Sequence, residues 1–160
     1  GGVSVGEADF VREILARLGE IHFWKLKIKP GRPMAFGRIG DAWLFGLPGN
    51  PVAVMVTFHQ LVSDALLTLM GCSPLPVRPS FKVPSRSAIN KPPGRQEYAR
   101  GVLAREGDGW TVRLTGEQGS GILSSMASAN CFVVLPEAGQ QVNVGDLVEV
   151  QPFDGAIWSA

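Results

Sequence analysis

Five basic side chains are concentrated between residues 25 and 38 of this sequence. Three of them are lysines spaced by two, so one extended strand would place their ammonium groups on a single face. No acidic residue lies between Glu20 and Asp41, so no nearby carboxylate neutralises Lys25, Lys27, Lys29, Arg32 and Arg38. Clustered cationic groups suit a phosphate or another oxyanion. A solvated edge strand, protected by its lysines against aggregation, explains the same spacing equally well.

A second candidate site is the expected start of a helix at Gly49, Asn50 and Pro51. Asn50 is a suitable N-cap, and Pro51 fits the first helical position, where no amide donor is needed. Unpaired amides and the helix dipole favour an anion there. Pro48 and Pro51 stiffen the loop around Gly49, which suits a preorganised site. A purely structural cap accounts for the same residues.

A third candidate is the stretch GGVSVG at the beginning of the sequence, which contains the small residues Gly1, Gly2, Ser4 and Gly6. Small side chains let a ligand approach the backbone amides. Glu7 and Asp9 follow at the expected start of a helix, where carboxylates can simply complement the dipole. Carboxylates beside a phosphate-binding loop can also hold a hard cation such as Mg²⁺ against a diphosphate.

Other site chemistries have less support in the sequence. His22 and His59 lie on different expected elements and have no partner at metal-ligand spacing. No Ser-His-Asp or Cys-His arrangement can be identified. Arg95 and Arg100 lie close together, and residues 118–121 form a polar turn. Either could contact a ligand, but we expect ordinary surface turns at both places.

Composition limits the broad class of protein. The chain has 160 residues, 45% of them hydrophobic, so it can bury a core. Its net charge of +1 argues against a general binder of nucleic acid or anionic membranes. No apolar run reaches the roughly 20 residues that span a bilayer, and no leader sequence opens the chain, so we expect a cytoplasmic protein. Cys72 and Cys131 are expected to be buried free thiols.

The elements that must position these residues follow from the apolar periodicity. A helix is expected over residues 7–18, ended by Gly19. Strands are expected over 22–28, 34–39 and 42–47, followed by a long helix over 51–70 that Gly71 ends. This order indicates the later half of an α/β layer, over residues 1–73. Because the chain begins with a loop type that usually follows a strand, we expect it to be part of a longer protein.

Residues 74–160 differ in composition and form a second expected domain. Prolines punctuate its beginning, and no convincing helical periodicity follows. Short strands are expected over residues 81–83, 98–105, 110–114, 131–135 and 147–152. This spacing is typical of a small β-barrel or sandwich. The expected fold class is therefore α/β followed by all-β.

Long stretches of the sequence resemble the molybdopterin molybdenumtransferase family, known in bacteria as MoeA. GGVSVGEADF, FWKLKIKPGRPMAFG and FGLPGNPVAVMVTF are similar to the closing half of that family's molybdopterin-binding domain. GRQEYARGVL, GEQGSGILSSM and ANCFVVLPE resemble its C-terminal β-barrel. The similarity follows the family's order and covers nearly the whole chain. It implies a partial three-layer α/β domain followed by a small barrel.

The resemblance also implies an activity, which is insertion of molybdenum from molybdate into adenylylated molybdopterin with Mg²⁺-dependent release of AMP. Asp9 matches the family's functional acidic residue, with a role in holding the metal. Lys25 and Lys29 match its functional lysines. The pterin-binding residues implied are Gly1, Gly2, Ser4, Gly6, Arg32, Pro48, Gly49, Asn50 and Pro51.

The resemblance sets expectations for partners as well. Family members are elongated homodimers, and a molybdopterin adenylyltransferase is an expected partner, whereas nucleic acid and membranes are not. The family's N-terminal segments, with another acidic site residue, are absent from this sequence. One family branch uses the same domains as a scaffold that clusters membrane receptors through a docked peptide. A pterin-binding chain without catalytic activity is a third interpretation.

Overall fold

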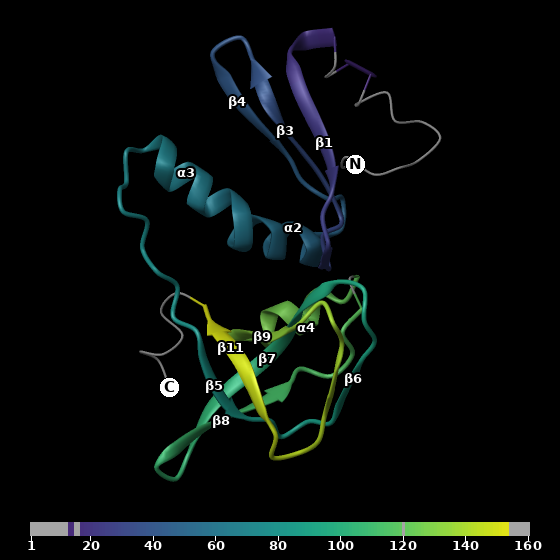
Figure 1. The fold of residues 1–160 in the computed structure, drawn as a ribbon, viewed down its shortest axis with the longest axis vertical. Helices are drawn as coiled ribbons and strands as arrows, with labels where there is room; N and C mark the ends of the chain where they lie inside the picture. The colour runs from purple at the N-terminus through teal and green to yellow at the C-terminus, as the bar shows by residue number, and fades with distance from the viewer. Residues whose placement is uncertain (1–12, 15–16, 120, 154–160) are drawn as a thin grey trace. The chain divides into compact units, whose positions relative to one another are not determined.

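The computed structural model describes residues 13–14, 17–119 and 121–153 (Figure 1). The chain divides into two compact units. The first takes the chain up to Leu26 and from Pro30 to Leu75, and the second takes Lys27–Lys29 and the chain from Pro76 onward. The segment Lys27–Lys29 therefore leaves the α/β part of the sequence and joins the all-β part. Residues 13–14 and 17–18, the described part of the first expected helix, are helical.

Three antiparallel strands form the sheet of the first unit, in the order β1–β3–β4. They are β1 (Glu20–Lys25), β3 (Pro33–Ile39) and β4 (Ala42–Gly46). A tight turn at Gly40, whose φ of 56° favours glycine, joins β3 to β4. The strands predicted over residues 34–39 and 42–47 are confirmed.

The strand predicted over residues 22–28 is wrong at its C-terminal end. β1 stops at Lys25, which pairs with Pro33. The amide of Leu26 then donates to the carbonyl of Arg32 at 2.7 Å, which closes the loop between β1 and β3. Ile28 and Lys29 form a separate strand, β2, in the other unit. The prediction failed because the alternation of apolar and basic residues continues past Lys25, where the backbone leaves β1.

One long helical segment completes the first unit, as the sequence predicted. It consists of α2 (Pro51–Thr57), a π-helical turn η1 (Phe58–Val62) that the sequence did not indicate, and α3 (Ser63–Leu69). Gly71, with a φ of 83°, ends it: its amide donates to Thr68 and that of Cys72 to Leu67, which is the Schellman pattern. The segment has 19 residues, and an 18-residue window of it has a mean hydropathy of 1.5. By length and composition alone it could cross a membrane, a property that core helices of soluble proteins share.

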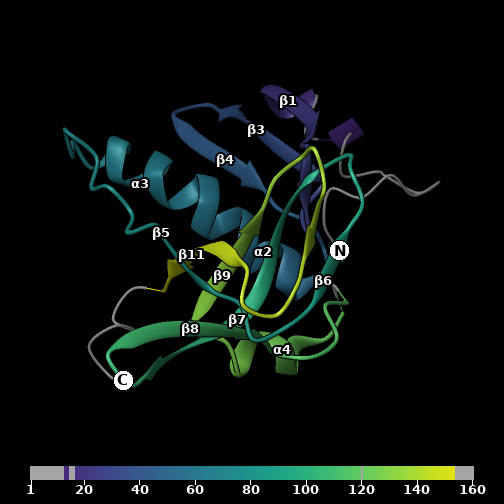
Figure 2. The same ribbon diagram turned by 60° about the horizontal axis from the view of Figure 1, so that its bottom comes forward.

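The second unit is built almost entirely from strands (Figure 2). In its six-stranded sheet, β7 has three partners, which are β2, β8 and β9. The sheet order is β2–β7–β9–β11–β5, with β8 on β7, and β10 and β6 form a separate ribbon. The elements are β5 (Phe81–Pro84), β6 (Ile89–Lys91), β7 (Gln96–Glu106), β8 (Gly109–Leu114), α4 (Leu123–Ala127), β9 (Cys131–Leu135), β10 (Gln140–Val142) and β11 (Leu147–Pro152).

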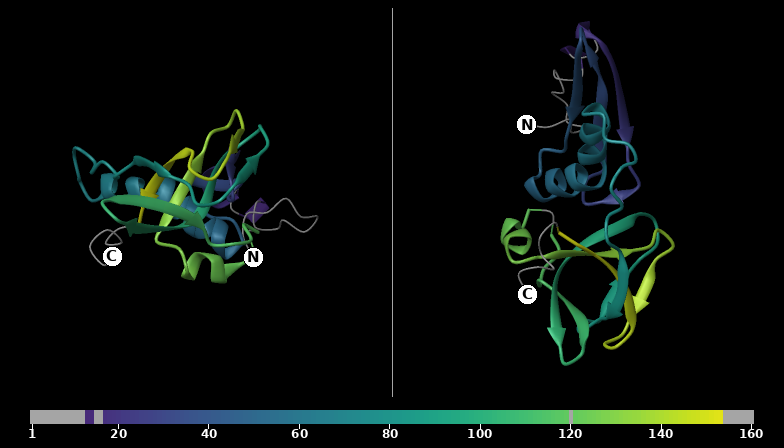
Figure 3. Two further views of the ribbon diagram at one scale, coloured as in Figure 1. Left: turned by 90° about the horizontal axis from the view of Figure 1, so that it is seen from below. Right: turned by 90° about the vertical axis from the view of Figure 1, so that its left-hand side faces the viewer.

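The sheet of the second unit curls but does not close into the barrel that the sequence suggested (Figure 3). Its described ladders run from β8 to β5, and a single bridge, Ser85 to Val112, links these two ends. The five predicted strands are all present, so the order of an α/β part followed by an all-β part is confirmed. The sequence missed β2, β6, β10 and α4, which have two to five residues each and no clear period.

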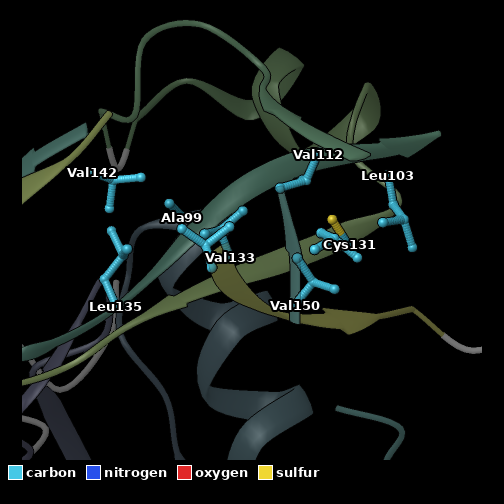
Figure 4. Packing of buried hydrophobic residues seen from close by; sticks show 10 residues of the cluster. Ala99, Leu103, Val112, Cys131, Val133, Leu135, Val142 and Val150 are labelled. Carbon is cyan, nitrogen blue, oxygen red and sulfur yellow. The ribbon is translucent and has the colours of Figure 1, made fainter. Parts of the chain in front are cut away.

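Apolar side chains from β5, β7, β8, β9, β10 and β11 meet in one core in the second unit (Figure 4). Cys131 is fully buried among them, and this burial raises the pKa of its thiol to about 12. The prediction of a buried free thiol is therefore confirmed for Cys131. Cys72 is also a free thiol, but it is only partly buried because it follows the helix end at Gly71.

The two thiols should react differently with a thiol reagent at pH 8. Cys72 should react in the native protein, whereas Cys131, with its pKa far above 8, should react only after unfolding. Counting released thionitrobenzoate before and after adding guanidinium measures this, and Cys131→Ala is the control. Rapid native labelling of Cys131 would contradict the packing.

Because its folded pKa exceeds the unfolded value, Cys131 stabilises the fold below about pH 9, and this contribution is lost as pH rises toward 12.

Candidate functional site

The structure does not place the three lysines on one face of one strand, so that prediction is wrong. Lys25 is the last residue of β1 in the first unit, whereas Lys27 and Lys29 belong to the second unit. We call residues 27–29 the strap. The amide of Gln96 donates to the carbonyl of Lys27 at 2.9 Å, and Ile28 and Lys29 pair in parallel with Gln96 and Glu97.

Within the strap, Lys29 faces a carboxylate that is nearly removed from solvent. Its Nζ lies 3.2 Å from both carboxylate oxygens of Glu97, which is directly opposite in the β2–β7 ladder. The Glu97 side chain is 11% exposed and that of Lys29 is 48% exposed. A carboxylate with so little water needs a positive partner to remain charged. Lys29 is the ion-pair partner that the described residues give it.

Lys27 makes a similar but more exposed ion pair. Its Nζ donates to a carboxylate oxygen of Glu137 at 2.9 Å, with side chains 75% and 51% exposed. The hydrogen bond and the negative charge of Glu137 raise the pKa of Lys27. Solvent-exposed pairs of this kind contribute little to stability. Each lysine of the strap thus forms an ion pair with a glutamate, and the Lys29–Glu97 pair is much less exposed than the Lys27–Glu137 pair.

The basic cluster is therefore largely neutralised, by partners that lie far away in the sequence or at a turn. Arg38 pairs with Asp41 at 2.9 Å, and its guanidinium lies 5.7 Å from the centre of the Trp43 ring. Within the part of the chain that the structure describes, Lys25 and Arg32 make no ion pair. Arg32 directly precedes Pro33, the ladder partner of Lys25, so these two exposed cations lie at the same end of the β1–β3 ladder.

The start of α2 is capped as predicted, and the cap limits what the helix can offer to an anion. The Asn50 Oδ1 accepts from the amides of Val52 and Ala53 at 3.1 and 3.4 Å. Pro51 has no amide proton, and the amide of Val54 donates to the carbonyl of Asn50. The first-turn amides are thus occupied. An anion at this loop must use the amides of Gly49 and Asn50, which precede the helix, beside the buried Pro48.

The acidic and glycine-rich candidates lie outside the described residues. These are Gly1, Gly2, Ser4, Gly6, Glu7 and Asp9. Among the residues that the structure does describe, no three potential His, Cys, Asp or Glu ligands gather at one place. The expected Mg²⁺ ligand, Asp9, is among the residues outside the described part of the chain.

Arg100 is not a surface residue, which corrects the expectation for it, whereas Gly119 of the polar turn is exposed as expected. Arg100 is fully buried on β7; its Nε donates to Ser125 Oγ at 3.1 Å and its Nη2 to the carbonyl of Gly119 at 3.0 Å. Gln118 accepts from the backbone amide of Arg100 and donates to its carbonyl, whereas the buried Nη1 of Arg100 has no partner among the described residues. Burial lowers the pKa of Arg100, and the charge of Glu97 partly opposes this. Nothing in the local sequence indicated this pairing across 18 residues.

The second unit also has a hollow of about 370 Å³. Among its lining residues are Lys82, Gln96, Val134, Pro136, Leu147 and Glu149. None of the site residues predicted from the sequence lines it. It mixes apolar and charged side chains, a combination that suits a short peptide better than a diphosphate.

Family models match the two parts of the chain in order. A probable molybdopterin-binding domain matches residues 1–68, and the MoeA C-terminal region, domain IV, matches residues 82–153. The chain belongs to the MoeA family. Its strap lies within the stretch matched by the pterin-binding model but belongs structurally to the second unit.

Individual MoeA-family relatives resemble the chain over nearly its full length. The molybdopterin molybdenumtransferase of Haemophilus influenzae is 41% identical over 96% of this chain, and molybdopterin molybdenumtransferase 1 of Mycobacterium tuberculosis is 34% identical over 94%. The chain spans only 38% and 37% of their lengths. A molybdenum cofactor biosynthesis protein of Pyrococcus furiosus aligns with a TM-score of 0.69 at 26% identity, over 92% of this chain and 55% of that one.

Removal of each strap lysine should test how differently the two ion pairs contribute to stability. Lys29→Ala leaves the Glu97 carboxylate nearly buried and unpaired, so the free energy of unfolding should fall by about 1–2 kcal/mol. Lys27→Ala removes an exposed pair and should change it little. Urea unfolding followed by tryptophan fluorescence measures both. Equal losses would mean that Glu97 does not depend on Lys29.

Proposed function

We propose that this chain forms part of an enzyme of molybdenum cofactor biosynthesis that inserts molybdenum from molybdate into adenylylated molybdopterin and releases AMP. The match of residues 1–68 to a molybdopterin-binding domain carries this proposal. Two curated relatives that bear the name molybdopterin molybdenumtransferase support it. Since the chain spans little more than a third of their lengths, the activity is proposed for a longer protein that contains it.

In this proposal the cationic side chains of the chain bind an anionic substrate in two different ways. Lys25 and Arg32, exposed and without ion pairs among the described residues, attract the phosphates and molybdate by their net charge. Lys29, already paired with Glu97, adds a fixed N–H donor rather than long-range attraction. The amides of Gly49 and Asn50, in a loop stiffened by Pro48 and Pro51, contact the pterin or its phosphate.

Asp9 is the proposed Mg²⁺ ligand, with Gly1, Gly2, Ser4 and Gly6 beside it against the substrate. Mg²⁺ typically takes one or two carboxylates together with substrate phosphates and water, so a single acidic residue of this chain suits it. When bound, Mg²⁺ would neutralise charge on the diphosphate. We also propose a cytoplasmic homodimer that receives its substrate from a molybdopterin adenylyltransferase.

A scaffold that binds a peptide is a second candidate, because the hollow beside Val134, Pro136 and Leu147 offers apolar surface with charged groups around it. Binding of a peptide in this hollow would not require any affinity for the pterin.

A third candidate is a pterin carrier without catalysis. Titration of molybdopterin with and without Mg²⁺, together with measurement of AMP release, distinguishes this carrier from the enzyme.

Substitution of the proposed site residues should impair the reaction in a protein of the relatives' length that contains this chain. Asp9→Asn, Lys25→Ala and Lys29→Ala should each lower molybdenum insertion and AMP release by roughly 10- to 100-fold, the range typical for loss of one charge-stabilising group. Lys82→Ala, an exposed lysine on β5, is the matched control and should keep the normal rate. Normal rates for all three site variants would refute the assignments.

A further inference from the structure

Glu97 and Lys29 both belong to the second unit, and the Glu97 carboxylate determines where the ammonium group of Lys29 lies. We propose that Glu97 is a positioning residue for Lys29, in that its carboxylate holds the ammonium group where it can bind an anionic substrate. This inference rests on the proposed function, since it gives Lys29 the role of a substrate-binding cation.

The geometry restrains Lys29 at both of its ends. Its backbone is fixed because it pairs with Glu97 in the β2–β7 ladder. Its ammonium is fixed because both Glu97 oxygens lie 3.2 Å away. A free lysine side chain loses rotamer entropy when a ligand immobilises it, and here that ordering precedes ligand binding.

The ion pair leaves Lys29 able to bind a second anion. An ammonium has three N–H donors, and Glu97 can accept two of them. Lys29 remains 48% exposed whereas Glu97 is 11% exposed, so the remaining donor is on the solvent side of the pair. A phosphate or molybdate oxygen could bind there while Glu97 stays in place.

Glu97 is better suited to this role than Glu137, the acidic partner of the other strap lysine. Glu137 bonds Lys27 through one printed contact, and both side chains are largely exposed, so solvent competes with the pair. Arg100, three residues along β7, is attracted to Glu97 but bonds Ser125 and Gly119 instead. Lys27 with Glu137 therefore provides an internal comparison of matched chemistry.

The role predicts an effect on turnover more than on affinity. Glu97→Gln removes the carboxylate charge but keeps the volume, so Lys29 loses its fixed position while a negative charge near the anionic substrate disappears. We expect kcat to fall about fivefold or more and KM to stay equal or fall.

The decisive experiment is a double-mutant cycle in a protein of the relatives' length that contains this chain. Glu97→Gln should lower kcat in the wild-type background but cause no further loss in the Lys29→Ala background, because Glu97 acts through Lys29. Glu97→Asp should restore part of kcat by returning the charge. Glu137→Gln should stay within about twofold of wild type. Thermal unfolding of each variant controls for stability.

The outcomes separate this inference from the proposed function. If Lys29→Ala is impaired but Glu97→Gln is normal, the positioning role is refuted and the proposed site stands. Additive losses from Glu97→Gln and Lys29→Ala would mean a general structural effect and would also refute it. A normal Lys29→Ala enzyme would refute the proposed assignment of Lys29 and the inference with it.

A measurement on the unmodified protein covers the case in which Glu97→Gln does not fold. Carbon-13 relaxation at the lysine Cε should show Lys29 to be more restricted than Lys25, which has no ion pair among the described residues. Equal mobility of the two lysines would overturn the proposal.

Discussion

The pairing of the strap with the edge of β7 is the constraint on which the arrangement of charged groups depends. β8 pairs with β7 only from Gly101 to Glu106, which leaves the edge at Gln96 and Glu97 for β2. Once Glu97 lies there with little access to water, a cation must accompany it, and Lys29 is opposite. The same pairing assigns Lys29 and Lys25 to different units, so a sequence that looks uniformly basic divides into a neutral pair in the second unit and exposed cations in the first.

Sequence reasoning succeeded where structure is decided by neighbouring residues. The β3–β4 hairpin follows from apolar strands around Gly40 and Asp41, and the limits of the long helix follow from Asn50, Pro51 and Gly71. It failed where a distant partner decides. Glu97 and Glu137 lie 68 and 110 residues from their lysines, so no local pattern could show that the cluster is neutralised. The short strands β6 and β10 likewise exist because each pairs with the other.

Arg100 organises the second unit by hydrogen bonding rather than by an ion pair. Its side chain joins β7 to the start of α4 and to the loop before it, while Gln118 occupies the backbone groups that β7 presents there. A buried guanidinium is costly unless its donors are satisfied. The loop and α4 supply acceptors for Nε and Nη2 of Arg100, whereas the buried Nη1 has none among the described residues, so the loop conformation that provides these two acceptors is favoured. This explains how a loop rich in glycine and serine acquires a defined path around Gly119.

The chain passes between the two units three times, at Leu26, Lys29 and Leu75, with consequences for modular evolution. Boundaries drawn from sequence families suggest two modules that recombination could separate at the proline-rich linker. Cutting there would remove β2 from its sheet and leave the β7 edge at Gln96 open to intermolecular strand pairing. A C-terminal region transferred without residues 27–29 would therefore lack the strand that pairs with this edge.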